Sequence, residues 1–364
     1  MPWTPTDANL LDLVGIGQRI DGYEFELRDT TGVLLGMLHP SRDAVPTVSM
    51  DATRSVRRQL SNMVLMPDEA ADIDPLTSEI RPVMVLQNGS RYGLGVFGLS
   101  DRSAPVHSWG TDRAVTWGDK TQLINQPITH SIGWGRGADV ALAAVGLMLE
   151  VLTLADLGVA PTSDVVFGAP VVYPPNTNRL SILEDFAVLL GWLPPYFDRD
   201  GLLQFKEVPD LPTAPATVTG YGPGTRIHAE SLVESDSLIE APNQFVVVES
   251  SGRSTIRGVY NVSDAAPHSA ANRNGRIIPL VTQVQGLNSQ SQANKAARAI
   301  AVTNRKGIFR FVAFDSTADP RHGTWDVVPY RKLVTDPFET YLELDWQHTC
   351  AAGAPMPHHL RKVY

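Results

Sequence analysis

The sequence predicts an α+β protein that is mainly β, in which two β-modules flank an α/β insertion. The 364 residues include 27 Pro and 29 Gly spread along the chain, a composition that indicates many turns. Short alternating or apolar runs occupy both ends of the chain, whereas residues 126–209 contain two helical patterns and a hairpin signal. Domains usually hold about 100–200 residues, so we expect three. They are a β-module with an N-terminal segment at 1–125, the insertion at 126–209, and a second β-module with one helix and a C-terminal tail at 210–364.

Alternating and apolar runs predict antiparallel strands in the first β-module. Tyr23–Leu27 alternates, Gly32–Leu38 is apolar, and Ile80–Leu86 resumes the pattern after a polar loop. Asn88-Gly89 then predicts a two-residue hairpin, because this pair suits the positive φ angles of a type I′ turn. Together these signals indicate a compact β-module.

A basic segment in the same module has two possible structures. Thr53–Leu60 fits either a short helix or a strand, and it carries Arg54, Arg57 and Arg58. These three arginines either contact acidic groups of a neighbouring subunit or line a surface of the chain itself.

Two helical patterns define the insertion, with a strand and loop expected between them at 158–175. The first pattern spans Asp139–Leu157, and the second begins near Asn176 and ends at Gly191. Apolar residues recur at helical spacing in the second pattern, so one of its faces is expected to be buried. They are Leu180, Leu183, Phe186, Ala187 and Leu190. Ser181 and Glu184 resemble a capping box near the start of this helix.

A hairpin signal follows the second helix at once. Asp198-Arg199-Asp200-Gly201 predicts a tight turn, because Gly tolerates positive φ and Asp accepts hydrogen bonds within its own turn. Asp198, Asp200 and Gly201 also match the start of a calcium loop. The acid at position five and the Glu at position twelve are missing, so a plain turn is favoured.

The second β-module shows strands interrupted by one helix. Asn243–Ser250 and Ile256–Asn261 read as strands, and Ile308–Phe314 alternates. Between them, Ser289–Asn304 has the period of a helix with a small apolar stripe. The stripe consists of Ala293, Ala297, Ile300 and Ala301.

Charge and cysteine content exclude several classes of protein. The formal net charge of −9 argues against binding to a phosphate backbone, so DNA that comes near the protein is expected to pass without sticking. Cys350 is the single cysteine, so no intrachain disulfide can form. The first residues lack the pattern of a secretory signal. The longest apolar run, Val140–Leu149, is about half of the ~20 residues that a membrane span requires, so membrane insertion is not expected.

Two groups of glycines resemble phosphate-binding loops only in part. Gly133, Gly135 and Gly137 precede a helix, but their spacing differs from both the dinucleotide fingerprint and the P-loop. Gly15 and Gly17 lack the third glycine. A turn or hinge is therefore preferred over a nucleotide site, and no cofactor is predicted.

Four residues near the C-terminus have side chains that bind Zn²⁺. They are His348, Cys350, His358 and His359. Their spacing matches no common zinc-finger pattern, so we interpret this part of the chain as a solvated tail. The sequence accordingly predicts no metal site.

The sequence also lacks the usual signatures of hydrolases. Gly-x-Ser-x-Gly and His-Glu-x-x-His do not occur. Glu184 and Asp185 diverge by about 100° on a helix, so a solvated face is expected rather than a shared substrate site. A glycosidase-type pair of carboxylates from distant parts of the sequence stays an open alternative, because nothing in the sequence identifies its members. No catalytic residue is predicted.

Several short motifs follow one another in order between Asp112 and Val328. They are the strand in Asp112–Gln126, Ile132–Ala138, the helix end Leu154–Val159, the second helix with its Asp-Gly hairpin, Asn243–Val248, the helix Ser289–Asn304, and Asp319-Pro320 followed by Gly323–Val328. In this order they resemble the hub proteins of bacteriophage tails, minor tail proteins of long-tailed phages that are similar to the baseplate hub of contractile tails. The last motif departs from the family pattern by two extra residues between Gly323 and Asp326.

This resemblance implies a fold and a structural function. Both β-modules would be antiparallel and barrel-like, and a homotrimer would form a pseudo-sixfold collar below the tail tube. The chain would be a non-enzymatic virion protein of a siphophage tail tip, found in the virion tail after synthesis in the bacterial cytoplasm. Its partners would be the distal tail ring or tail tube, the tape-measure protein, and spike or receptor-binding proteins of the tip. An acidic channel would let DNA pass by repelling its phosphates.

Three alternative functions fit less well. A hexameric distal tail ring protein would carry one β-module rather than two. A cell-wall-cleaving tail enzyme would need a further domain, for which little chain is left after the second module. A carbohydrate-binding protein would expose aromatic rings such as Trp109, Trp117 and Trp134, which we expect instead in cores or between subunits.

Overall fold

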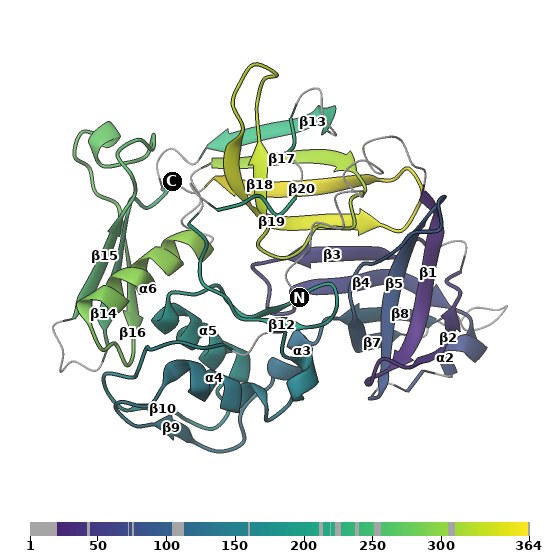
Figure 1. Cartoon of the computed structure of the whole chain (residues 1–364), viewed down its shortest axis with the longest axis horizontal. Helices are drawn as coiled ribbons and strands as arrows, with labels where there is room; N and C mark the ends of the chain where they lie inside the picture. The colour runs from purple at the N-terminus through teal and green to yellow at the C-terminus, as the bar shows by residue number, and fades with distance from the viewer. Residues whose placement is uncertain are drawn as a thin grey trace.

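The architecture was analysed in a computed structural model, which describes residues 20–362 except 42–43, 72, 75, 104–112, 159–160, 211–213, 219, 223–226, 237–239, 251–255 and 305–309. Strands predominate over helices, which confirms the predicted α+β, mainly β class. The strands and helices separate into a large sheet and a smaller helical part (Figure 1).

Most strands belong to one large antiparallel sheet. Its spatial order is β13 (Ile227–Asp236), β17 (Arg310–Thr317), β20 (Pro355–Lys362), β19 (Glu339–Thr349), β3 (Thr47–Asp51), β4 (Arg58–Leu65), β8 (Arg113–Gly118), β7 (Phe97–Ser103), β5 (Ser78–Leu86), β1 (Ile20–Asp29) and β2 (Leu34–Leu38), with β18 (Val327–Tyr330) on β19 and β6 (Arg91–Gly93) on β5. Strands from the start and the end of the chain meet where β3 pairs with β19, as Figure 1 shows. In that pair Val48 lies opposite His348, and Met50 lies opposite Trp346.

This continuous sheet corrects the expectation of two barrel-like modules. In the part of the chain that the structure describes, the strands close into no barrel. The physical reason is the position of β3, which is paired on one side with β4 and on the other with β19 from the distant end of the chain. Among the described strands, the path of the sheet runs through this pair and ends at β2 and β13. The domain boundaries at residues 125 and 209 stay predictions.

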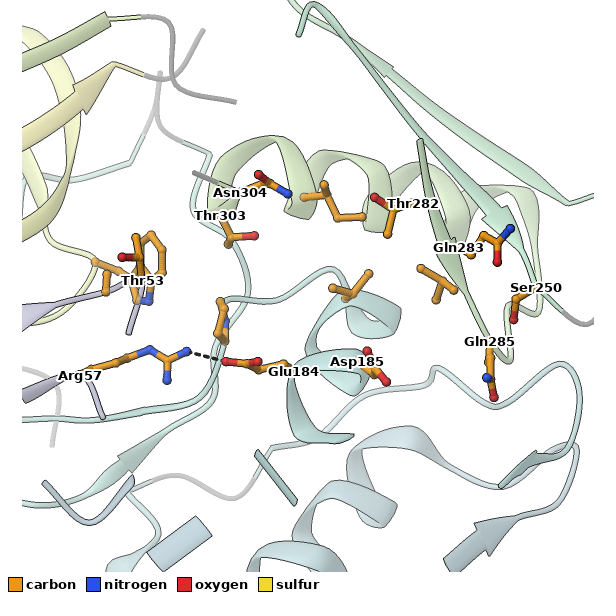
Figure 2. Close-up of a pocket in the computed structure, with 16 residues that line it drawn as sticks. Thr53, Arg57, Glu184, Asp185, Ser250, Thr282, Gln283, Gln285, Thr303 and Asn304 are labelled. Atoms are coloured by element: carbon orange, nitrogen blue, oxygen red, sulfur yellow. Dashed lines mark hydrogen bonds and ion pairs between the residues drawn. The ribbon is translucent and has the colours of Figure 1, made fainter. Parts of the chain in front are cut away.

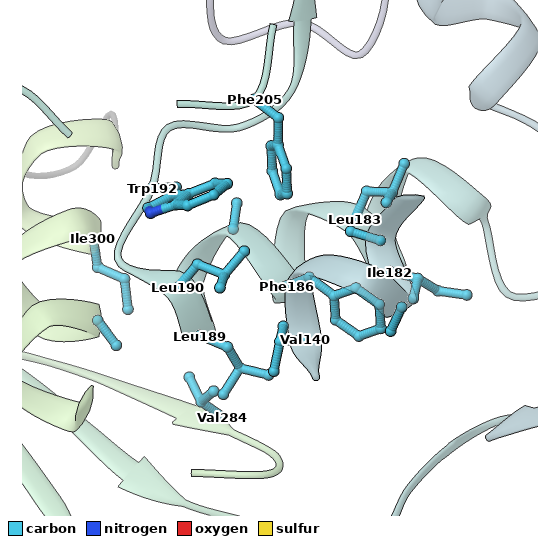
Figure 3. Close-up of a cluster of buried hydrophobic side chains, with 14 of the residues drawn as sticks. Val140, Ile182, Leu183, Phe186, Leu189, Leu190, Trp192, Phe205, Val284 and Ile300 are labelled. Carbon is cyan, nitrogen blue, oxygen red and sulfur yellow. The ribbon is translucent and has the colours of Figure 1, made fainter. Parts of the chain in front are cut away.

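The helical part surrounds a hydrophobic core of its own. α5 (Arg179–Leu190) contacts both α4 (Val140–Met148) and α6 (Gln290–Thr303), and α6 covers a three-stranded sheet. That sheet consists of β15 (Arg257–Asn261), β14 (Gln244–Glu249) and β16 (Pro279–Val284). Figure 3 shows members of the core from four elements, namely Phe186 and Leu189 of α5, Val140 of α4, Ile300 of α6 and Val284 of β16. The predicted insertion thus shares its core with residues 244–303.

Short elements lie between these longer ones. They are α2 (Pro67–Ala71), α3 (Thr121–Ile124), β9 (Ile132–Trp134) paired with β10 (Val171–Tyr173), the 3₁₀ turns η2 (Leu154–Asp156) and η3 (Ala271–Arg273), and β11 (Tyr196–Phe197) paired with β12 (Leu203–Gln204).

The start of α5 differs from the prediction. Asn178 is the N-cap, because its side chain accepts a hydrogen bond from the Leu180 amide at 2.9 Å. Ser181 and Glu184 lie inside the helix, so their interpretation as a capping box is wrong. Gly191 ends the helix as predicted, in the left-handed conformation with φ 73°.

The helix predicted over Asp139–Leu157 is shorter than expected. α4 is capped by Asp139 and ends at Met148, and η2 follows separately. The chain turns there because Leu152 packs back into the core and Glu150 pairs with Arg179 of α5 at 2.9 Å. In the described part of the chain, no helix is both long and apolar enough to cross a membrane.

The ambiguous segment Thr53–Leu60 is neither a helix nor a full strand. Its first residues form turns, and β4 begins at Arg58. Both predicted hairpins are present, with Gly89 at φ 81° between β5 and β6 and Gly201 at φ 75° between β11 and β12. The type I′ turn expected at Asn88-Gly89 is wrong, because only Gly89 of this pair has a positive φ; its amide donates to the main-chain oxygen of Leu86 at 2.8 Å. The strands predicted in the second module are β14, β15 and the described part of β17, and the predicted helix is α6.

We predict that Gly258→Ala lowers the free energy of unfolding by about 3 kcal/mol or more. Gly258 lies in β15 beneath α6, and an added Cβ would stand 1.9 Å from the main-chain oxygen of Ala293. Gly146→Ala in α4 is the matched control, since its Cβ would meet nothing within 4 Å. This control should gain about 0.5–1 kcal/mol from helix propensity. Urea denaturation measures both variants, and equal midpoints would contradict the close approach of α6 to β15.

Candidate functional site

A polar pocket of about 600 Å³ lies where the large sheet meets the helical part. Figure 2 shows side chains from four segments around it: Thr53 and Arg57 before β4, Glu184 and Asp185 of α5, Thr303 and Asn304 at the end of α6, and Thr282, Gln283 and Gln285 in and after β16. These segments are far apart in sequence, so the pocket forms only when the sheet and the helices pack together.

The pocket contains one buried cation and two carboxylates. Arg57 Nη2 is 3.0 Å from Glu184 Oε1, whereas its Nε and Nη1 atoms are buried and have no hydrogen-bond partner among the described residues. Tyr173 donates a 3.0 Å hydrogen bond to Asp185, and burial raises the pKa of this carboxyl. Both acids of α5 line this pocket, but each contacts a different partner, Arg57 for Glu184 and Tyr173 for Asp185. The expectation that they diverge on the helix and share no substrate stays a prediction.

The described lining of this pocket is polar and contains no His, Cys or Lys. It offers amides, hydroxyls, one guanidinium and two carboxylates, groups that bind polar ligands or peptide segments.

The three arginines of the basic segment have different surroundings. Arg54 is exposed and pairs with Asp51 at 3.1 Å. Arg57 and Arg58 are only 3% and 1% exposed, and both contact other parts of the same chain. Burial therefore excludes Arg57 and Arg58 from the predicted intersubunit contact, and the prediction stays open for Arg54 alone.

Arg58 lies at the junction between the strands of the two chain ends. Its guanidinium donates to the main-chain oxygens of Leu94 at 3.4 Å and of His322 at 3.0 Å. It also lies 5.3 Å from the ring centroid of Trp346. Trp346 in turn donates to the main-chain oxygen of Gly323 at 2.8 Å. One cation from β4 thus holds the loop after β17 against β19.

A second group of polar side chains is buried nearby in the large sheet. His322, Glu343 and His358 place their nitrogen and oxygen atoms within 4.8 Å of one another, and all three are at most 2% exposed. The Nδ1 atoms of both imidazoles are 2.6 Å from the Glu343 carboxylate, one on each oxygen. On the outer side, His322 Nε2 is 2.6 Å from the Tyr221 hydroxyl, and His358 Nε2 is 2.8 Å from Ser316 Oγ.

The protonation of this cluster is set by burial and by one carboxylate. Burial alone lowers the pKa of His322, but Glu343 raises it to about 9. Burial keeps the pKa of His358 below its usual value, although it also bonds to Glu343. Burial opposes the charge on Glu343, yet its two imidazole partners hold its pKa below the usual value.

The interpretation of the C-terminal segment as a solvated tail is wrong. Residues 355–362 form β20, an inner strand paired with β17 and β19. Met356, His358 and Leu360 alternate on its buried side and are at most 1% exposed. His359 lies on the opposite face and pairs with Asp345.

The four residues considered for Zn²⁺ do not share one site. His348 is buried against Tyr23, with its Nε2 3.0 Å from the Tyr23 hydroxyl. Burial raises the pKa of the Cys350 thiol to about 12. Only His358 joins a cluster of metal-ligand type, and its partners there are His322 and Glu343.

Sequence reasoning missed both of these partners. Glu343 lies one residue before a register shift in β19, and His322 lies in the loop between β17 and β18. Their positions near His358 depend on strand register, which no local spacing reveals. A buried acid in an otherwise apolar strand, as in Tyr341-Leu342-Glu343-Leu344, was the one available signal.

The remaining sequence-based interpretations concern turns and aromatic rings. Gly137, with φ 85°, lies in the turn before α4, and Asp198 accepts hydrogen bonds from the amides of Asp200 and Leu202, each at 3.0 Å. Both are turns, as expected.

Trp117 is fully buried and Trp134 packs against Phe186, so neither forms an exposed platform. Gly15, Gly17 and Trp109 lie outside the described residues.

Comparison with proteins of known structure shows which proteins share this fold. No family model and no curated protein matches the sequence. Among solved structures, the tail protein from Neisseria meningitidis MC58 has a TM-score of 0.62 at 12% identity, with 94% of this chain and 96% of that chain covered. The chain has the fold of phage tail proteins. The 43 kDa tail protein of prophage MuSo2 from Shewanella oneidensis gives 0.58 at 13% identity, covering 93% and 98% of the two chains.

A third phage tail protein has the same fold. The prophage tail protein gp18 from Listeria monocytogenes EGD-e has a TM-score of 0.52 at 9% identity, covering 93% of this chain and 94% of that one. The phage tail fold therefore extends over nearly the whole chain, including the helical part. This likeness agrees with the resemblance carried by the ordered motifs.

We predict that His348 makes the protein less stable in acid. Burial lowers the pKa of His348 to about 4 in the folded state, against about 6.5 when unfolded. The unfolded chain therefore binds a proton first as the pH falls from about 6.5 to 4, which costs roughly 3 kcal/mol of stability. Urea denaturation between pH 7 and 4.5 should show a shallower decline for His348→Gln. Tyr23→Phe leaves His348 buried, so this variant should lose stability with falling pH nearly as steeply as the wild type. If stability falls equally steeply in the wild type and in His348→Gln, His348 is not the group responsible.

Arg58→Leu is expected to lower the free energy of unfolding by about 3 kcal/mol or more, because it leaves buried main-chain oxygens without a donor. Arg54→Leu, at an exposed position in the same segment, should change stability by no more than about 0.5 kcal/mol. Guanidinium denaturation compares the two variants. Similar losses in both would show that Arg58 does not hold the junction.

Proposed function

We propose that this chain is a non-enzymatic structural protein of a bacteriophage tail tip, in which three copies form a hub ring. The observation that carries the proposal is the fold shared with three phage tail proteins over 93–94% of the chain. The ordered motifs between Asp112 and Val328 support the hub in particular.

The proposed hub lies between the tail tube and the proteins that contact the host. Its partners are the distal tail ring or tail tube above, spike or receptor-binding proteins below, and the tape-measure protein and DNA in transit through the ring. The protein is made in the host cytoplasm and located in the virion tail. A hexameric distal tail ring protein is the alternative that the symmetry of the assembled tip would distinguish.

The two ends of the large sheet support assembly into a closed ring. A head-to-tail ring needs two different surfaces on each subunit, and the described sheet ends at β2 on one side and β13 on the other. The β2 end carries Val33, Leu34, Leu35 and Met37, which are 37–58% exposed. Successive strand residues point to opposite faces, so this hairpin presents apolar side chains on both. Exposed apolar edges of this kind pair with other chains, and we assign this one to a second copy of the chain.

The charge of the chain supports transit of DNA without retention. A net charge of −9 repels phosphates over distances near the Debye length, about 8 Å at physiological salt. A basic ring would instead hold the DNA through counterion release.

Images of assembled tail tips test the proposal directly. Averaging of intact particles, with the chain located by a tag or antibody, should show three copies in a ring next to the tail tube. Six copies would favour the distal tail ring, and absence of the chain from the tail would refute the proposal.

We predict that Leu34→Lys combined with Leu35→Lys blocks incorporation of the chain into tails, because two charges replace the apolar contact at the β2 edge. Complementation of a phage that lacks the chain should then yield at least tenfold fewer plaques, a loss equivalent to about 1.4 kcal/mol if it follows a single equilibrium. Leu142→Lys is the matched control, since Leu142 is 70% exposed in α4, which belongs to the helical part and not to the large sheet. Circular dichroism checks that both variants fold. Normal plaque numbers with the folded double variant would rule out this edge as the contact.

A further inference from the structure

The hydroxyl of Ser316 determines where His358 carries its proton. Ser316 Oγ is 2.8 Å from the main-chain oxygen of Thr317, which can only accept, so the single hydroxyl proton is used there. With its proton used there, Ser316 Oγ accepts from His358 Nε2, which lies 2.8 Å away. In this arrangement His358 carries a proton on Nε2, and a neutral ring presents a lone pair at Nδ1.

That lone pair faces a carboxylate at close range. His358 Nδ1 is 2.6 Å from Glu343 Oε1, and two acceptors at this separation repel unless a positive charge lies between them. The His322 ring lies 4.6 Å away between centroids, and its Nδ1 atom is 2.6 Å from the other oxygen of the same carboxylate. In the metal-free chain, protons on the imidazoles supply the positive charge beside Glu343. A bound divalent ion takes their place and leaves both rings neutral.

We propose that His322, Glu343 and His358 form a metal site for a divalent first-row ion of the Zn²⁺ class. Two imidazole nitrogens and a carboxylate are donors that this ion prefers. All three donor atoms lie within 4.8 Å of one another. The bound ion replaces the two Nδ1 to carboxylate contacts, and the ligand atoms separate to roughly 3.3 Å, as bonds of about 2.0–2.2 Å in a tetrahedral site require.

The surroundings of the three ligands match those of a metal centre. The outer nitrogen of each imidazole contacts a hydroxyl oxygen, that of Tyr221 for His322 and that of Ser316 for His358. Such contacts fix the ring orientation of metal-binding histidines. Asp326 is a further carboxylate at this cluster, with its Oδ2 4.0 Å from His322 Nδ1, and it is the candidate for a fourth ligand.

The ion in this site is structural and is bound during folding. Its ligands come from the loop after β17, from β19 and from β20, so it ties three segments of the second half of the sheet together. All three ligands are at most 2% exposed, which leaves no route for rapid exchange with solvent in the folded chain. The site does not depend on assembly into a tail.

Metal analysis of the purified full-length chain tests the proposal. The chain is produced without a histidine tag in medium containing Zn²⁺, and its metal content is measured by mass spectrometry. We expect about one ion per wild-type chain and at least a tenfold loss in His358→Ala and Glu343→Gln. His359→Ala is the matched control, because the adjacent imidazole lies on the opposite face of β20 and should leave the metal content unchanged.

A milder variant and a refolding measurement cover the case in which the ligand variants fail to fold. Ser316→Ala keeps every ligand and should weaken metal affinity by roughly 10-fold to 100-fold. Wild-type chain refolded with Zn²⁺ should unfold at a higher urea concentration than chain refolded with a chelator. With Co²⁺ in place of Zn²⁺, the refolded chain should show visible absorption bands. A metal-free wild-type chain whose midpoint is the same with and without Zn²⁺, or equal metal content in His358→Ala and wild type, would overturn the proposal.

Discussion

The pairing of β3 with β19 is the interaction on which the rest of the structure depends. It places Val48 opposite His348 and joins strands from the start and the end of the chain, which would otherwise belong to separate sheets. The cost in chain entropy is modest, because the cost of closing a loop grows only with the logarithm of its length. The gain includes a hydrogen-bonded ladder and the burial of Met50 and Trp346, which are 1% and 4% exposed. One open sheet is the result, and the polar pocket forms where this sheet meets the helices.

Polar contacts determine the register at this junction. Apolar strands can slip by two residues and still bury the same face, whereas directional hydrogen bonds are lost by any slip. Arg58 reaches the main-chain oxygen of His322, Trp346 reaches that of Gly323, and Tyr23 reaches His348. Each contact joins residues from distant parts of the sequence or from different strands. The buried polar groups therefore specify one alignment of the two halves, at the cost of removing charged and polar atoms from water.

Local features could be predicted from the sequence, and long-range features could not. Gly89, Gly191 and Gly201 marked turns and a helix end correctly, because each needs a positive φ that the residue type itself reveals. The spacing of Ser181 and Glu184 led to a wrong prediction of a capping box. Asn178 caps α5 three residues earlier, so both residues lie inside the helix. The open sheet and the cluster around Glu343 arise from pairing between distant strands, for which single-sequence periodicity carries no information. His358 was noticed in the sequence, but its partners became visible only in the fold.

The same pairing bears on how copies of the chain can assemble. Strands in a sheet rotate by roughly 20–25° relative to their neighbours, so the angle between the two end strands accumulates over every strand between them. In this chain the ends are β2 and β13, and the β3–β19 pair lies inside the path that joins them. A ring closes only if that accumulated angle suits the number of copies. If the two edges meet in the ring as proposed, the contacts that hold β3 against β19 also set the geometry of those edges. Arg58 would then influence assembly, although β4 lies in the middle of the strand order, far from either edge.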